Sequence, residues 1–249
     1  MPPSILVTGA ARRIGAVIAH AFGERGWHVV IHCGSSCPEA DALASALPSA
    51  EVIQCDLADA PAVRDMAATL AARLDDWRVL VNSAAVFHED TAQAYSPAVF
   101  AEAMAVNAAA PAQLAQTFLA KGRARAGKRL IHLTDMKLAN PNPDFFSYTM
   151  SKHALAATVR MLAMARPDST DRVYAIAPGA ILASHDQEEA ETERSHRMNP
   201  LDRKTGAEEI ADAALFLAEG WLASGETIFV DSGQHLLAQP RDVLYLARQ

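Results

Sequence analysis

The stretch "ILVTGAARRIG" at residues 5–15 gives the clearest indication of the fold. An apolar run leads directly into Thr8 and Gly9, and Gly15 follows one turn into a helical pattern. A glycine where a strand turns into a helix lets the backbone approach a phosphate group, and the helix N-terminus offers free N–H groups to it. Such a turn can also be only a turn, so its meaning depends on the rest of the chain. As the first strand–helix unit of a longer alternation, it predicts a nucleotide-binding sheet.

Short apolar runs and Ala-rich helical segments do alternate along almost the whole chain. Several of the runs are apolar on both faces, as in a parallel sheet with helices on both sides. The sequence therefore predicts one α/β domain over residues 1–249, a doubly wound Rossmann-type fold with a mostly parallel sheet. Strands are expected at 4–8, 28–32, 51–55, 78–82, 129–133, 172–177 and 227–230. Helices are expected at 13–26, 61–74, 112–124, 148–165 and 207–218, where apolar residues recur at i, i+3 and i+4.

The composition excludes several classes of function. A net charge of −7 leaves no basic stripe for a nucleic acid. The N-terminus lacks the pattern of a signal peptide, and no apolar run approaches the length of a membrane span. Three cysteines, Cys33, Cys37 and Cys55, are an odd number without histidine partners, so we expect reduced thiols rather than a metal site or a disulfide framework. These features predict a cytoplasmic protein.

The end of the second expected strand favours NADP(H) over NAD(H). An NAD site usually carries an acidic residue about 20 residues after the glycine turn. Here Cys33 is followed by Gly34, Ser35 and Ser36. Hydroxyl groups there, with Arg12 and Arg13 from the glycine turn, could receive a 2′-phosphate that a carboxylate would repel. Ser36 could equally cap the next helix.

Polar residues at other strand ends are further candidates for cofactor contacts. Asp56 could accept a hydrogen bond from an adenine amino group, or it could cap the next helix. After Asn82, the small residues Ser83 and Ala84 would let the chain lie against a cofactor. Asn107 lies within an Ala-rich helical segment, where its low helix propensity indicates a specific hydrogen bond.

A second group of polar residues carries chemistry. Tyr148 and Lys152 are four residues apart, so they share one face of a helix. An ammonium group beside a phenol lowers the pKa of the phenol and helps it to exchange a proton. Asp135 stands at the exit of a strand, with twelve residues between it and Tyr148.

Taken in order, the glycine turn, "VNSAAVF", Asn107, the Tyr-x-x-x-Lys pair and "APG" resemble the short-chain dehydrogenase/reductase family over residues 4–233. Most members of that family have a serine at the position of Asp135 and a glycine at the position of Arg13. Those two departures, with "NSAAVF" ending in Phe87 and the helix start "YTMSKHAL", resemble the pteridine reductase branch, which includes the bacterial dihydromonapterin reductases.

The resemblance implies an NADPH-dependent reduction of a pterin, in a homotetramer. It implies that Asp135, Tyr148 and Lys152 are catalytic, and that Arg13, Phe87, Asp135 and Tyr148 bind the substrate. The cofactor contacts that it implies are Thr8, Gly9, Arg12, Arg13, Ile14, Gly15, Ser35, Ser36, Asp56, Leu57, Asn82, Ser83, Ala84, Asn107, Thr134, Lys152, Pro178, Gly179 and Ile181.

The exchange of serine for Asp135 suits pterin chemistry. A pterin offers ring N–H and amino donors, and reduction of its C=N bond requires a proton on nitrogen. A carboxylate accepts from such donors and also opposes ionisation of Tyr148, which keeps the phenol a proton donor. Two alternatives stay open: Asp135 could cap a loop or pair with Lys137, and Phe87 could be ordinary core. Ala85 also departs from the serine found in many pterin-reducing relatives.

Two segments are expected to lie outside the regular alternation. Residues 181–206, acidic and then basic, could be a solvated surface helix, but we favour a lid over the site. The tail at 236–249 carries Val243, Leu244 and Leu246, which we expect to pack on a neighbouring subunit. Two other functions stay open: reduction of another small carbonyl or imine compound, and nucleotide sensing without catalysis.

Overall fold

A computed structural model describes residues 2–183 and 187–249 of the chain. Seven strands form one sheet in the order β3-β2-β1-β4-β5-β6-β7, and every neighbouring pair is parallel. The predicted doubly wound α/β fold is confirmed, and the sheet is wholly rather than mostly parallel. Its strands are β1 Ser4–Val7, β2 His28–Cys33, β3 Ala50–Gln54, β4 Trp77–Asn82, β5 Arg129–Leu133, β6 Arg172–Pro178 and β7 Thr227–Val230.

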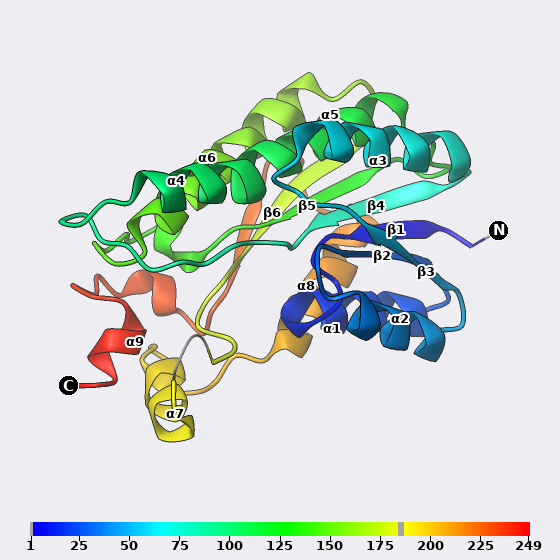
Figure 1. Ribbon diagram of the computed structural model, residues 1–249. Helices are drawn as coiled ribbons and strands as arrows, with labels where there is room; N and C mark the ends of the chain where they lie inside the picture. The colour runs from blue at the N-terminus through cyan, green and yellow to red at the C-terminus, as the bar shows by residue number, and fades with distance from the viewer. Residues whose placement is uncertain (1, 184–186) are drawn as a thin grey trace.

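Helices cover both faces of the sheet (Figure 1). One layer holds α1 Arg13–Glu24, α2 Cys37–Ala46 and α8 Ala207–Glu219. The other holds α3 Ala60–Arg73, α4 Pro97–Met104, α5 Ala110–Lys121 and α6 Phe146–Ala165. Two further helices, α7 Glu189–Arg197 and α9 Val243–Leu246, lie together away from both layers, at the lower left of the view.

The double coverage explains why the strands are apolar throughout. Successive side chains of a strand point to opposite faces. In β1, Ile5 and Val7 belong to the apolar core beneath α1 and α8, whereas Leu6 belongs to the core beneath α3 and α5. All three are fully buried. Each strand therefore contributes to two cores, and burial of apolar area on both faces stabilises the sheet.

Several short elements were not predicted. The helix α2 has few buried residues, and α4 continues into α5 through a π-helical segment at Ala105–Ala109. Two 3₁₀ turns, Met136–Leu138 and Gln234–Leu236, follow β5 and β7. Their sequences lack a sustained apolar period, so pattern alone does not identify them.

The topology directs the strand ends to one site. The chain reverses direction of winding between β1 and β4, which are neighbours in the sheet, and ligands of such folds bind outside the carboxyl ends at this position. A cavity of about 460 Å³ lies there. No helix in the described ranges is long and apolar enough for a membrane span. Among the same residues, no group of three His, Cys, Asp or Glu side chains could hold a metal ion.

Candidate active site

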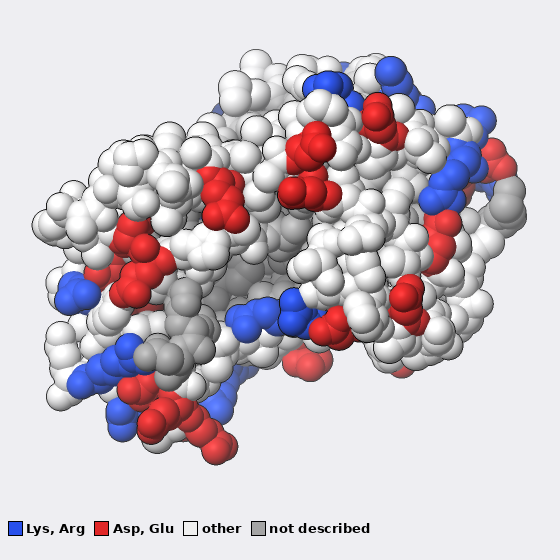
Figure 2. Space-filling view, in the orientation of Figure 1, with Lys and Arg blue, Asp and Glu red and all other residues white. Residues whose placement is uncertain are grey.

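The cavity runs from the glycine turn to the start of α6. Figure 2 shows the hollow on this face, with basic side chains at its edge. Of the predicted cofactor and catalytic residues, those that line it are Gly9, Arg12, Arg13, Ile14, Gly15, Ser36, Ser83, Ala84, Thr134, Asp135, Tyr148, Lys152, Pro178, Gly179 and Ile181. Phe87, predicted to contact the substrate, lines it too. Segments far apart in the sequence thus meet around one space.

The glycine turn is built for close backbone approach. Gly9 has φ +65°, and a Cβ on it would lie 2.8 Å from the Cα of Ala84. A Cβ on Gly15 would lie 2.4 Å from the carbonyl oxygen of Gly9. Both positions therefore require glycine. Among the described residues no side chain caps the start of α1, so its first N–H groups are available to an anion.

Arg13 occupies a position where the backbone favours glycine. Its φ is +57°, in the left-handed region, which costs a residue with a Cβ about 1–2 kcal/mol. Its guanidinium donates to the carbonyl oxygen of Ala183 at 3.0 Å, at the start of the predicted lid segment. A residue held in such a conformation at a cavity wall is a sign of function rather than of packing.

The end of β2 supplies hydroxyl and guanidinium groups. Ser36 stands at the N-cap position of α2 but caps nothing with its side chain; its hydroxyl accepts from the Arg12 guanidinium instead. Arg12 also lies 3.8 Å from a carboxylate oxygen of Glu39. Ser35 is exposed and outside the cavity lining, as is Gln54, which binds the carbonyl oxygen of Gly34.

Five other predicted cofactor residues lie outside the cavity lining: Thr8, Asp56, Leu57, Asn82 and Asn107. Thr8 accepts hydrogen bonds from the backbone N–H groups of Ser83 and Ala84, at 3.0 and 3.1 Å, and so joins β1 to the loop after β4. Leu57 is buried. Asp56 accepts from the N–H of Ala58 at 2.9 Å, but the N-cap of α3 is Asp59, so the expectation that Asp56 caps this helix is wrong.

Asn82 and Asn107 also hold the wall in place. The Asn82 amide binds Nδ1 of His132 across β4 and β5 at 3.1 Å. Asn107, fully buried in the π-helical segment, accepts from the N–H of Val86 at 2.8 Å and donates to its carbonyl oxygen at 2.9 Å. The predicted specific hydrogen bond of Asn107 is confirmed, and it positions the loop that carries Phe87.

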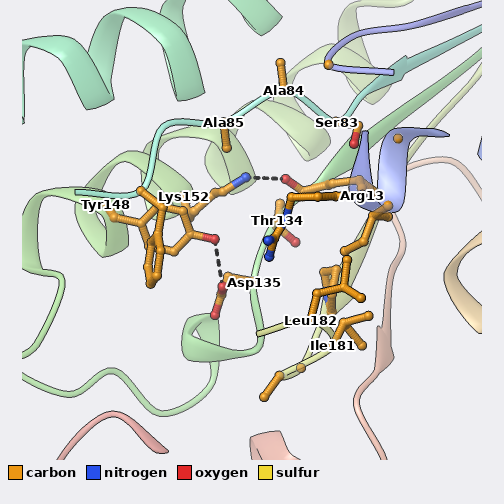
Figure 3. A pocket seen from close by; sticks show the side chains of 18 of the residues that line it. Arg13, Ser83, Ala84, Ala85, Thr134, Asp135, Tyr148, Lys152, Ile181 and Leu182 are labelled. Atoms are coloured by element: carbon orange, nitrogen blue, oxygen red, sulfur yellow. Dashed lines mark hydrogen bonds between the residues drawn. The ribbon is translucent and has the colours of Figure 1, made fainter. Parts of the chain in front are cut away.

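At the end of the cavity near α6, three polar side chains lie close together: Asp135, Tyr148 and Lys152 (Figure 3). The Tyr148 hydroxyl donates to Oδ2 of Asp135 at 2.8 Å. Oδ1 of the same carboxylate accepts from the backbone N–H of Lys137 at 2.9 Å, so Asp135 caps its loop as well as binding Tyr148. Nζ of Lys152 donates to the carbonyl oxygen of Leu133 at 2.8 Å and lies 5.5 Å from the centre of the Tyr148 ring.

The electrostatics of this group keep Tyr148 protonated. Burial, with the charge of Asp135, raises the pKa of Tyr148 well above its usual value. The expectation that Lys152 lowers the pKa of the phenol is wrong in this state, because burial and the charge of Asp135 raise that pKa, whereas the expected opposition of Asp135 to ionisation of Tyr148 agrees with the shift. Burial raises the pKa of Asp135, and Lys137 acts against that shift. Burial lowers the pKa of Lys152 to about 8.

Aromatic rings form the wall beside Tyr148. Phe87 stacks on Phe145 with 4.1 Å between ring centres, and it meets the Tyr148 ring edge-on at 4.6 Å. Phe145 is buried with φ +51° at the start of α6. The backbone N–H of Ser147 donates to Asp90 at 2.9 Å, which caps this helix from the loop after β4. Phe87 is therefore both a packed residue and a cavity wall.

The third wall comes partly from the predicted lid segment and partly from the tail, whose place at the cavity the sequence did not identify. Three of its residues come from α7 and the segment just before it, namely Gln187, Ser195 and His196. Two more, Asp242 and Leu244, come from the tail. Residues 184–186 of the predicted 181–206 lid lie outside the described residues. The expectation that Val243 and Leu244 pack on a neighbouring subunit is wrong, because both are buried within their own chain at the cavity. The helix α7 is polar and lacks an apolar stripe, so periodicity alone does not show which of its residues contact the cavity.

Comparison with known proteins places this geometry in a family. A family model described as enoyl-(acyl carrier protein) reductase matches residues 9–235. The crystal structure of FolM alternative dihydrofolate reductase 1 from Brucella canis, complexed with NADP, superimposes with a TM-score of 0.89 at 34% identity, over 96% of each chain. Dihydromonapterin reductase from Klebsiella pneumoniae is 27% identical over 94% of this chain and 98% of its own.

A relative with a different name is equally similar in sequence. The putative ketoacyl reductase 2 of the granaticin polyketide synthase from Streptomyces violaceoruber is 29% identical over 94% of this chain and 97% of its own. All of these relatives are named reductases. The chain belongs to the short-chain dehydrogenase/reductase family of oxidoreductases.

Proposed function

We propose that this chain is an NADPH-dependent reductase of a pterin, which converts a dihydropterin to a tetrahydropterin. The observation that carries the proposal is the 2.8 Å hydrogen bond from the Tyr148 hydroxyl to the Asp135 carboxylate within the cavity. A pterin presents N–H and amino donors to its binding site. An ionised carboxylate is an acceptor only, and it suits those donors.

The residues of the cleft fit NADP(H). A Cβ on Gly9 or Gly15 would collide with neighbouring backbone, the start of α1 is uncapped, and Arg12 and Ser36 stand at the end of β2. We assign the diphosphate to the glycine turn and the 2′-phosphate to Arg12 and Ser36. When bound, the cofactor supplies the hydride. The similar Brucella canis protein was crystallised as a complex with NADP, which supports this assignment.

The protein supplies the proton. Reduction of a C=N bond needs a proton on nitrogen, and the Tyr148 hydroxyl, whose pKa is raised, retains one. The raised pKa of Asp135 brings its carboxyl closer to a protonated state at working pH, so the hydrogen-bonded pair can pass a proton between its members. Lys152, held by the Leu133 carbonyl oxygen, places a positive charge beneath them.

The flat wall suits a flat ring. Phe87 lines the cavity next to Tyr148, and its packing on Phe145 fixes its plane. Aromatic rings prefer offset-stacked contacts with other π-systems. We therefore assign one face of the pterin to Phe87 and an edge to Arg13. The names dihydromonapterin reductase and pteridine reductase among the relatives support a substrate of this class.

The second candidate is reduction of a ketone, which the similarity to the putative ketoacyl reductase favours. A developing alkoxide needs hydrogen-bond donors, and Asp135 offers one only when it is protonated. Tyr148 would then be the neutral donor to the alkoxide. A nucleotide sensor without catalysis is a weaker alternative, because Asp135, Tyr148 and Lys152 stand together in the cavity. The cytoplasmic location and the homotetramer stay predictions.

The test is a substrate panel with the purified chain. NADPH oxidation is followed with dihydromonapterin, dihydrobiopterin, dihydrofolate and a β-ketoacyl thioester, each over a range of concentrations. We expect turnover of at least one dihydropterin with kcat/KM at least tenfold above that of the thioester. Turnover of the thioester alone would establish the ketone reductase, and no turnover of any compound with intact NADPH binding would favour the sensor.

A further inference from the structure

The C-terminal tail, residues 236–249, is held at the site by contacts with Asp144, Arg194 and Lys137. Oδ2 of Asp144 accepts from Nε of Arg241 at 2.7 Å and from the backbone N–H of Asp242 at 2.8 Å. On the other side, the guanidinium of Arg194 in α7 donates twice to the carbonyl oxygen of Ala247, at 2.7 and 3.0 Å. The tail thus bridges the start of α6 and the predicted lid.

One of these contacts is made by Lys137, a near neighbour in sequence of the candidate catalytic residue Asp135. Nζ of Lys137 lies 2.6 Å from Oδ2 of Asp242, and both side chains are buried. The same ammonium donates to the carbonyl oxygen of Asp144 at 3.3 Å and lies 5.1 Å from the centre of the Phe145 ring. A buried ammonium without a partner is unfavourable by several kcal/mol, so Lys137 requires the carboxylate that the tail provides.

Lys137 is two residues from Asp135, and it acts on that carboxylate in two ways. Its backbone N–H donates to Oδ1 of Asp135 at 2.9 Å, and its charge favours the ionised carboxylate against the effect of burial. Asp242 also lines the cavity, and its charge is among those that raise the pKa of Tyr148. The Asp135–Tyr148 pair therefore lies within the field of a buried ion pair whose negative member comes from the tail.

We propose that Lys137 and Asp242 are a positioning pair, in which the docked tail neutralises Lys137 and so sets the charge of Asp135. This inference rests on the proposed role of Asp135 in the reductase. The charged and titratable groups that act on Asp135 are Lys137 from its own turn and Tyr148 and Lys152 from α6. Asp242 of the tail pairs with Lys137 and lines the cavity. His196 of α7 lines the same cavity.

The proposal predicts opposite effects from the two members. With Lys137→Met the positive charge is lost, and Asp135 should bind its proton up to a higher pH. With Asp242→Asn the ammonium is left unneutralised beside Asp135, which should then lose its proton at a lower pH. A merely structural pair would not shift the titration in opposite directions. Because Asp242 acts through Lys137, the titration midpoint of Asp135 in the double variant should equal that in Lys137→Met.

The experiment measures the titration of Asp135 directly in the full-length chain. Aspartate carboxyl carbons are labelled with ¹³C, the Asp135 resonance is assigned by its loss in Asp135→Asn, and its midpoint is followed by NMR without substrate. This readout does not depend on turnover, so failure of the pterin assignment and failure of this inference are distinguishable. Arg248→Gln is the matched control, because it removes a tail-to-α7 ion pair at Glu191 that does not touch Lys137.

We expect the midpoint to rise in Lys137→Met and in the double variant, to fall in Asp242→Asn, and to stay at its wild-type value in Arg248→Gln. If Asp242→Asn does not fold, the double variant, which carries no unpaired ammonium, tests whether Asp242 acts through Lys137: a midpoint different from that of Lys137→Met would overturn the proposal. Unchanged midpoints in Lys137→Met and the double variant, or a shift in the same direction in both single variants, would overturn the proposal.

Discussion

Asp135 shows how a single exchange of residue type alters a site. Burial acts to keep its carboxyl protonated, whereas Lys137 and the Tyr148 hydroxyl favour the carboxylate. A serine at this position would donate a hydrogen bond, but it could not carry a charge or exchange a proton near neutral pH. The family resemblance implied that Asp135 acts with Tyr148, and a loop cap was the alternative. The structure shows both contacts at once, because each carboxylate oxygen has its own partner.

The first prediction concerns the two members of the proton-carrying pair. Tyr148→Phe should reduce kcat for a dihydropterin by about 10²–10⁴, as loss of a positioned proton donor typically does. Adding Asp135→Asn should reduce kcat little further, because the two groups act as one unit. Presteady-state turnover of both single variants and the double variant measures this. Reductions that multiply would show two independent roles.

The second prediction concerns pH. The pKa of Lys152 is lowered to about 8, so its ammonium is present below that pH and is lost as the pH rises through it. Reduction should therefore fall as the pH rises above about 8. Lys152→Arg keeps its charge over this range and should move the falling limb to higher pH. The kcat/KM profile from pH 6 to 10 checks the sign, and an identical limb in both proteins would assign it to another group.

At the scale of elements, the strands were predictable, whereas the place of the tail at the cavity and its contact with α7 were not. Each strand of a covered parallel sheet is apolar for its whole length, a signal that is local in sequence. The helix α7 is charged around most of its surface, and its contact with the cavity depends on the tail. Asp144 and Asp242, which share a hydrogen bond, are 98 residues apart. No local pattern indicates such a contact.

The third prediction concerns the segment 187–206 at the α7 edge of the cavity. Ser195 and His196 are buried at the cavity, and Arg13 binds the backbone at Ala183. Ligands that fill the cleft should therefore order this segment. Amide hydrogen exchange should slow there with NADPH and a dihydropterin together, while α5, on the other layer, exchanges as before. Unchanged exchange at α7 would support the solvated surface helix instead.

At the scale of the whole molecule, the strand order separates the residues assigned to the 2′-phosphate from the candidate catalytic residues, at opposite ends of one cleft. Ser36, which binds Arg12, follows the end of β2. Asp135 follows the end of β5, at the opposite end of the cleft. The neighbours β1 and β4 lie between them. The order of the strands was not evident from individual residues. The sequence predicted only a doubly wound, mostly parallel sheet, and the structure supplies the order β3-β2-β1-β4-β5-β6-β7.

The fourth prediction tests the separation of the two ends. NADPH should bind much more tightly than NADH, because Arg12 and Ser36 face the position assigned to the 2′-phosphate. Arg12→Gln should weaken NADPH binding by about 10- to 100-fold, the usual effect of a lost charged hydrogen bond, and should leave NADH unaffected. Isothermal titration with both cofactors measures this. Equal affinities in the wild-type chain would contradict the assignment of the β2 end.

The central claim is that Asp135 is part of the proton machinery of a pterin reductase. The most direct measurement is kcat for a dihydropterin in Asp135→Ser, which restores the residue usual in the family, together with its NADPH dissociation constant. We expect kcat to fall by about 10²–10⁴ while the dissociation constant stays the same, because the glycine turn and Lys152 are unchanged. Full dihydropterin turnover in Asp135→Ser would contradict the account and leave the carboxylate as a cap of its own loop.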